Sequence, residues 1–167
     1  PDLKVTLGYP DVDPANIKQL QALKLVNPNL KTLISIGGWT WSGRFSDAAL
    51  TDASRTAFAD SAVYFMKQYG FDGIDLDWEY PVSGGLSTNV RRPEDKQNFT
   101  LLLQKLREKL DAQGAIDQKH YLLAIAGGAS TGYIGTVELA KIHPYLDYAS
   151  VMTYDLHGTW DAYTDFH

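Results

Sequence analysis

The chain has 167 residues, of which 44% are hydrophobic, enough for one ordinary domain with a sizeable core. The net charge of −5 is mild and the Lys and Arg residues are scattered, so we expect no nucleic-acid partner. No apolar run approaches the roughly 20 residues that span a bilayer, and the absence of cysteine excludes disulfides, thiolate catalysis and zinc fingers. The chain begins at Pro1 without a Met or a signal peptide, so we expect a processed or truncated start.

Apolar periodicity and turn residues predict alternating helices and strands. Asp13-Pro14 starts the first helix, Gly70 ends the second in a left-handed conformation, and Gly114 ends the third. The predicted elements are, in chain order, a strand fragment at 4–8, a helix near 14–26, a strand over 32–36, a helix near 51–69, a strand over 71–79, a loop over 81–93, a helix over 94–112, a strand over 121–126, a short helix near 136–142 and a strand near 148–154. The alternation predicts one α/β domain whose parallel strands are joined by right-handed crossovers.

The alternation fits either a barrel or an open doubly wound sheet. In both folds ligands bind at the carboxyl ends of the strands. Glycine pairs and polar or aromatic residues stand at all four predicted strand ends, namely Gly37-Gly38-Trp39, Asp77–Tyr80, Gly127-Gly128 and Met152–Asp155. We therefore expect one binding site where these four segments converge, with the glycines allowing aromatic loops to approach it.

The predicted strand 71–79 carries an unusual row of acids. Because side chains alternate between the two faces of a strand, Asp75, Asp77 and Glu79 share one face and the apolar residues between them share the other. The apolar face suits packing against helices. Three ionised carboxylates in a row repel one another and resist burial, so their face needs a chemical purpose.

Three interpretations of this acidic face compete. It is a solvated edge strand, a divalent-metal site, or a site of acid–base chemistry in which neighbouring acids push their pKa values apart. The calcium-loop pattern requires a glycine where Tyr80 stands, which argues against that kind of metal site. Trp78 and Tyr80 flank Glu79 and would raise its pKa further, which favours the acid–base interpretation.

Three segments resemble a known family. DGIDLDWEYP (72–81) is similar to the DxxDxDxE signature of glycoside hydrolase family 18, the chitinases. SIGGWTWSGRFSD (35–47) and MTYDLHGTWD (152–161) resemble that family's segments on its third and sixth barrel strands, in the family's order and spacing. The resemblance implies a TIM (β/α)8 barrel, here incomplete, with about four βα units that correspond to strands 3 to 6.

The resemblance also implies a chemistry and a role for each matching residue. It implies hydrolysis of β-1,4-linked N-acetylglucosamine polymers with retention, in which the substrate's own acetamido oxygen acts as the nucleophile. Glu79 matches the general acid, Asp77 the residue that orients the acetamido group, and Asp75 its partner deeper in the barrel. Tyr154 matches the hydroxyl that holds the acetamido oxygen, and Asp155 a nearby substrate contact. With this resemblance we expect no cofactor and no metal.

Further residues match the sugar-binding cleft. Trp39, Tyr80 and Trp160 lie just beyond strand ends, where the family stacks aromatic rings on sugar faces, and Met152 matches the floor of the pocket. Asp72, at the start of the acidic strand and on its opposite face, is expected to be structural. The implied partners are chitin or N-acetylglucosamine oligosaccharides, and the implied location is extracellular.

The match covers only part of the family's fold. Residues 1–167 correspond to a fragment of a single catalytic domain, without its first two and last two strands. An open arc of four strands leaves two unpaired edges, so we expect the isolated chain to associate and to have little activity. Two alternatives share the fold: an endo-β-N-acetylglucosaminidase acting on glycoprotein glycans, and a non-catalytic chitin-binding lectin, which would typically lack the acid at Glu79.

Overall fold

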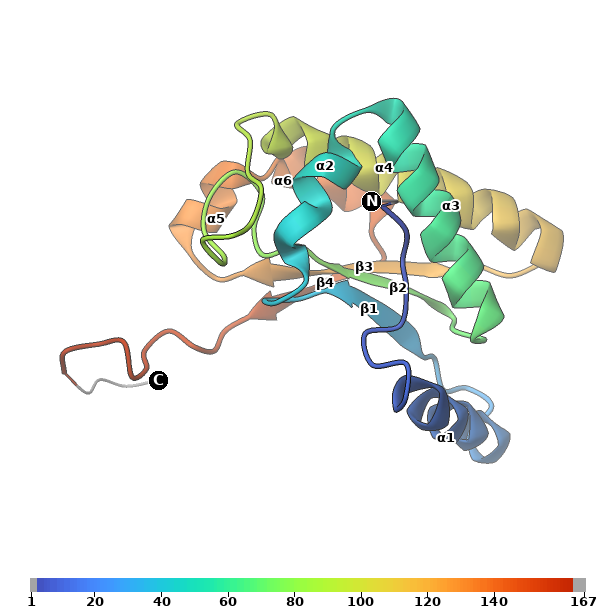
Figure 1. Ribbon diagram of the computed structural model, residues 1–167. Helices are drawn as coiled ribbons and strands as arrows, with labels where there is room; N and C mark the ends of the chain where they lie inside the picture. Colours follow the sequence, from blue (N-terminus) through green and yellow to red (C-terminus); the bar gives the residue numbers. More distant parts are fainter. Residues whose placement is uncertain (1–2, 164–167) are drawn as a thin grey trace.

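The computed structural model describes residues 3–163, which form one parallel sheet with a layer of helices against it (Figure 1). The strands are β1 (Leu33–Gly37), β2 (Gly73–Asp77), β3 (Leu122–Gly128) and β4 (Tyr148–Met152). The helices are α1 (Asp13–Val26), α2 (Phe45–Ala49), α3 (Asp52–Gln68), α4 (Asp95–Asp117), α5 (Thr131–Thr136) and α6 (Leu139–Ile142), with short 3-10 turns at Ser42–Arg44 and His143–Tyr145.

The order of the strands distinguishes between the two predicted architectures. Each strand pairs in parallel with the next one along the chain, in the order β1-β2-β3-β4. Helices α2 to α6 all lie on one side of the sheet (Figure 1). A doubly wound sheet reverses its strand order and has helices on both faces, whereas a barrel adds strands in sequence with every helix outside. The sheet is therefore an arc of a TIM barrel, as the resemblance implied.

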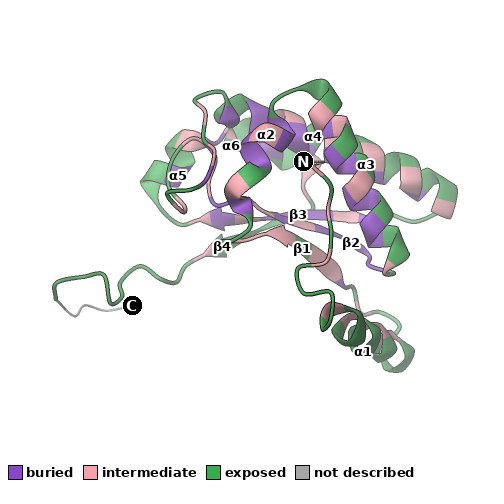
Figure 2. Ribbon diagram, viewed as in Figure 1, coloured by how far each residue is buried: buried purple, intermediate pink, exposed green. Residues whose placement is uncertain are grey.

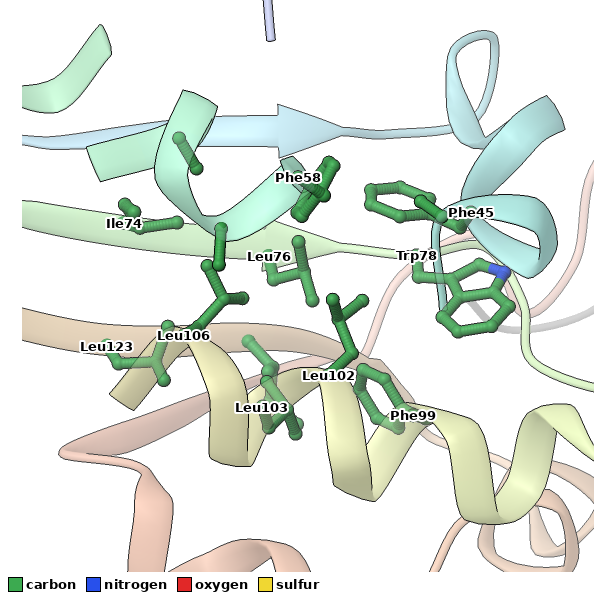
Figure 3. Close-up of a cluster of buried hydrophobic side chains, with 14 of the residues drawn as sticks. Phe45, Phe58, Ile74, Leu76, Trp78, Phe99, Leu102, Leu103, Leu106 and Leu123 are labelled. Atoms are coloured by element: carbon green, nitrogen blue, oxygen red, sulfur yellow. The ribbon is translucent and has the colours of Figure 1, made fainter. Parts of the chain in front are cut away.

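The core lies between the sheet and helices α3 and α4 (Figure 2). The apolar face of β2 supplies Ile74 and Leu76, and Trp78 follows just past the strand; none is more than 2% exposed. Trp78 stacks on Phe45 with ring centroids 5.5 Å apart and meets Phe99 of α4 edge-on at 5.6 Å (Figure 3). The alternation predicted for 71–79 is thus confirmed: the apolar side chains face the helices and the acids face the other way.

Helix α3 begins and ends where its sequence predicts. The Thr51 hydroxyl accepts a hydrogen bond from the Ser54 amide while the Ser54 hydroxyl accepts one from the Thr51 amide, a reciprocal cap. Gly70 follows the helix with φ +72°, the left-handed conformation that glycine adopts without strain. The chain then turns directly into β2, and Asp72 accepts hydrogen bonds from the Thr32 amide and the Lys119 ammonium, in line with its predicted structural role.

Some local predictions were wrong. Residues 4–8 form no strand, and the helix expected near 136–142 is replaced by the two short helices α5 and α6. Val12, rather than the expected Asp13, occupies the cap position of α1, and the Asp13 carboxylate accepts a hydrogen bond from the Tyr9 amide.

Gly114 also differs from its predicted role, because it lies inside α4, which continues to Asp117. The chain beyond the helix folds back so closely that a Cβ at Gly114 would lie 2.3 Å from the Lys119 carbonyl oxygen. A glycine is therefore needed for this close approach, and Gln118 takes the left-handed conformation that ends the helix.

The two edges of the arc are exposed. No residue of α1 is buried, and its apolar residues Leu23 and Leu25 are 53% and 86% exposed (Figure 2). At the other edge, Val151 of β4 is 56% exposed. In a closed barrel, neighbouring strands and helices cover such positions. In this arc the same positions present apolar surface and unpaired backbone groups to water.

We predict that the isolated 167-residue chain self-associates through these edges. Leu23→Lys combined with Val151→Lys should lower the average mass measured by sedimentation equilibrium, because each lysine opposes stacking of two apolar surfaces. Ile116→Lys is the matched control: Ile116 is 76% exposed but lies at the far end of α4. A monomeric chain with a sharp cooperative melt would contradict the prediction.

Candidate active site

A cleft of about 1010 Å³ opens at the carboxyl ends of the strands. The structure brings eight of the nine predicted site residues to its walls: Trp39, Asp77, Glu79, Tyr80, Met152, Tyr154, Asp155 and Trp160. Asp75 is the exception. It lies two residues back along β2, and its Oδ2 accepts a hydrogen bond of 3.2 Å from the Ser35 hydroxyl of β1. Residues from the ends of β1, β2 and β4 thus converge on one cavity.

The ends of β1 and β2 approach unusually closely. The Gly38 amide donates a hydrogen bond of 2.7 Å to the Asp77 carbonyl, and a Cβ at Gly37 would lie only 2.2 Å from that same oxygen. Gly37 also has φ +111°, which favours glycine. The first glycine pair therefore permits the contact that places the Asp77 carboxylate beside the loop bearing Trp39.

Burial raises the pKa of all three acids, and the other two acids of the row add to the shift of Asp77 alone. Burial, together with the charges of Glu79 and Asp75, raises the pKa of Asp77 to about 6. Burial also raises the pKa of Glu79, assisted by the charge of Asp155 and opposed by a hydrogen bond with Tyr80. Burial likewise raises the pKa of Asp75, against the effect of the Ser35 hydrogen bond. All three acids therefore hold protons at a higher pH than free carboxyl groups.

Two of these carboxylates keep an oxygen free of protein partners. Oδ1 of Asp75 and Oδ1 of Asp77 are buried and accept no hydrogen bond within the described residues 3–163. Buried polar atoms are nearly always paired in folded proteins. Such atoms next to a cleft are available for a ligand, for water, or for a shared proton.

Large side chains stand open to solvent around the acids. Trp39 is 51% exposed, Trp160 is 65% exposed and Tyr154 is 56% exposed. Tyr80 is less exposed and meets Tyr133 edge-on with ring centroids 5.8 Å apart. Exposed tryptophan faces flanking carboxyl groups suit a ligand with flat apolar faces and hydrogen-bonding edges, which describes a pyranose ring.

A profile of one family, Glycosyl hydrolases family 18, matches residues 2–167. The chain belongs to glycoside hydrolase family 18. It is 65% identical over 145 residues to Chitinase A1 of Niallia circulans, a match that covers 87% of this chain and 21% of that protein.

Solved structures in the same family have the same fold. Chitinase ChiW of Paenibacillus sp. str. FPU-7, described as a cell-surface-expressed multi-modular enzyme, superposes with a TM-score of 0.90 at 59% identity, covering 95% of this chain and 18% of that one. A family 18 N-acetylglucosaminidase of Paenibacillus barengoltzii also superposes with a TM-score of 0.90, at 44% identity, covering all of this chain and 48% of that one. The chain therefore spans less than half the length of these relatives.

Tyr133 of α5 is a cleft residue of this family 18 chain that was not predicted from the sequence. It lines the cleft, is only 9% exposed, and its hydroxyl has no hydrogen-bond partner within residues 3–163. Burial and the nearby Asp77 charge raise its pKa to about 12, so it remains a neutral donor. Cβ atoms at Gly127 and Gly128 would lie 3.1 and 3.2 Å from its side chain, so the glycine pair makes room for Tyr133. An aromatic residue five positions after a glycine pair is the sequence signal that could have identified it.

Over residues 3–163 no three His, Cys, Asp or Glu side chains are placed to hold one metal ion. In the same range no helix has the length and apolar character needed to cross a bilayer.

We predict that Asp77→Asn stabilises the folded protein at pH 7 and has little effect at pH 3. The folded-state pKa of about 6 lies above the unfolded value, so the native state binds more protons, and stability is lost as the pH rises from about 4 to about 6. Because Asp77 is half-buried and partly screened, we expect a gain on the order of 1–2 kcal/mol at pH 7. Urea denaturation of the unmodified full protein and of the variant at both pH values measures this gain, and a variant that is no more stable than the unmodified protein at pH 7 refutes it.

Proposed function

We propose that the protein carrying this chain hydrolyses β-1,4 bonds between N-acetylglucosamine units of chitin, with retention and assistance from the substrate's acetamido group. The observation that carries the proposal is the arrangement of the cleft. Glu79 and Asp77, two acids with raised pKa values, lie in the same cavity as the exposed rings of Trp39 and Trp160. The names of the family 18 relatives, Chitinase A1 and Chitinase ChiW, support the substrate class.

Glu79 is the proton donor in this proposal. It is the last acid of the row, and its raised pKa keeps a proton on the carboxyl group at higher pH than usual. As the bond between the anomeric carbon and the glycosidic oxygen breaks, that oxygen takes its electron pair and the proton of Glu79. The Glu79 carboxylate then accepts a proton from the water that completes hydrolysis.

The neighbouring acids serve the acetamido group. Its carbonyl oxygen bonds to the anomeric carbon and forms an oxazolinium-type intermediate, so no protein nucleophile is needed. Asp77, whose Oδ1 lacks a protein partner, accepts a hydrogen bond from the acetamido N–H, and the Tyr154 hydroxyl donates to the acetamido oxygen. Asp75 lies behind Asp77 along β2, and its carboxylate shares or takes the proton of Asp77 as charge develops.

The remaining residues hold the sugar chain. Trp39, Trp160 and Tyr80 stack on sugar faces, while Met152 and Asp155 contact the sugar at the site of cleavage. Because chitin is an insoluble polymer outside the cell, this substrate implies that the protein acts extracellularly.

Two alternatives with the same fold, and one with different chemistry, make different predictions. An endo-β-N-acetylglucosaminidase would cleave the core of glycoprotein glycans faster than chitin oligosaccharides. A lectin would bind those oligosaccharides without cleaving them, but such proteins have no need of the acid at Glu79. A metal-dependent hydrolase would lose activity on treatment with a chelator, whereas the proposed mechanism is indifferent to it.

Removal of the proton donor is the first test. In the full protein, Glu79→Gln should lower turnover of a chitin oligosaccharide by about 10²–10⁴-fold, the usual contribution of a positioned acid. Glu108→Gln is the control, since Glu108 lies on the exposed face of α4 and pairs only with Lys105 among the described residues. Undiminished cleavage by Glu79→Gln would show that the acid assignment is wrong.

The stereochemistry of the product tests the acetamido mechanism separately. Retention predicts that the newly formed reducing end is the β-anomer, which proton NMR detects before mutarotation. An α-anomer as the first product would require direct attack by water and would rule out the oxazolinium route.

A further inference from the structure

The main chain of Glu79 lies beyond the hydrogen bonds of the sheet. Strand β2 ends at Asp77, where its pairing with β1 closes at Gly37, and its pairing with β3 closes one residue earlier at Leu76. Glu79 itself is only 8% exposed. Its backbone N–H and C=O therefore need partners other than strands or water, because buried backbone groups are almost always paired.

Ser42 supplies the first partner. The backbone N–H of Glu79 donates a hydrogen bond of 2.8 Å to the Ser42 hydroxyl, which has no exposed surface. That hydroxyl in turn lies 2.8 Å from the Gly38 carbonyl oxygen and 3.1 Å from the Asp77 carbonyl oxygen, and either oxygen accepts a hydrogen bond from it. One side chain thus links the proposed acid to the β1 loop that carries Trp39.

Asn89 supplies the second partner. Its Nδ2 donates a hydrogen bond of 3.0 Å to the Glu79 carbonyl, and the residue is only 9% exposed. Asn89 is held in turn by its own amide, which donates to the Leu86 carbonyl at 3.0 Å, and by the next amide, Val90, which donates to the Gly43 carbonyl at 3.1 Å. The backbone of Asn89 and of the next residue is therefore hydrogen-bonded, which fixes the position of the side chain that donates to the Glu79 carbonyl.

The surrounding loop packs tightly on the same carbonyl. A Cβ at Gly85 would lie 2.1 Å from the Glu79 carbonyl oxygen and 2.7 Å from Asn89 Nδ2, and Gly85 has φ +68°. No larger residue fits there without moving the Asn89 contact. The carbonyl is thus enclosed by one glycine and one donor, which leaves Glu79 little freedom to shift.

We propose that Ser42 and Asn89 are positioning residues for the Glu79 acid. They hold its N–H and its C=O from two different loops, so that its carboxyl group is fixed relative to the bond it protonates. This inference rests on the proposed function. Its consequence is specific: loss of either side chain impairs proton donation to the leaving group more than it impairs the rest of the site.

The test compares two substrates whose leaving groups need different amounts of acid assistance. The leaving group of a chitin oligosaccharide is a sugar alcohol, so its departure depends on protonation by the acid. The leaving group of the 2,4-dinitrophenyl glycoside of N,N′-diacetylchitobiose is a stabilised phenolate, which scarcely needs protonation. The parameter is kcat/KM, which reports the steps up to bond cleavage and not the later attack of water.

In the full protein, Ser42→Ala and Asn89→Asp should each lower kcat/KM for the oligosaccharide by about 10–100-fold, the scale of loss caused by slight misplacement of a catalytic group. The value for the dinitrophenyl glycoside should fall less than about 3-fold, because that reaction hardly uses the acid. Asn89→Asp keeps the size of the side chain while removing the donor. It therefore tests the proposal even if the Ser42 variant fails to fold.

Ser46→Ala is the matched control. Ser46 is also fully buried, four residues further on, but its hydroxyl bonds Asp95 at 2.6 Å and Arg92 at 2.8 Å rather than Glu79. Any change it causes should be equal for the two substrates. Equal losses for both substrates in Ser42→Ala and Asn89→Asp would overturn the positioning role. If the proposed function itself is wrong, the result is a different one: the unmodified protein cleaves neither substrate.

Discussion

The structure depends on one constraint: Asp75 and Asp77 share one face of β2, and Glu79 follows just past the strand, while the opposite face is buried. Ile74, Leu76 and Trp78 fix the orientation of the strand, since a slip by one residue would exchange the two faces and place acids in the core. The apolar packing between the sheet and α4 therefore holds together charges that repel one another. That repulsion, added to burial, raises the pKa of Asp77.

The neighbouring elements are shaped around these acids. Gly37 and Gly38 bring the end of β1 against Asp77, and Gly127 and Gly128 make room for Tyr133 on the other side. Exposed rings from two loops complete the cleft. Family 18 membership places this arrangement in a barrel, of which residues 3–163 form an arc with sequential strands and one layer of helices.

The sequence predicted those features that depend on local pattern. Strict alternation over 71–79 was enough to place the acids on one face, and strand-end motifs were enough to assemble the cleft. Features that depend on contacts between segments far apart in the sequence were missed, notably Ser42 and Asn89, because a single serine or asparagine between the predicted elements carries no periodic signal. Gly114 was misread because a close backbone contact and a helix end select the same residue type.

The central claim is that burial and the charges of Glu79 and Asp75 together raise the pKa of Asp77. Carbon-13 NMR of the side-chain carboxyl of Asp77, followed as a function of pH, tests it most directly. We expect an apparent pKa of about 6 in the unmodified protein and a lower value in Glu79→Gln, because removing the neighbouring charge removes part of the cause of the shift. An Asp77 carboxyl that titrates like a free aspartate, and does not respond to Glu79→Gln, would contradict the account.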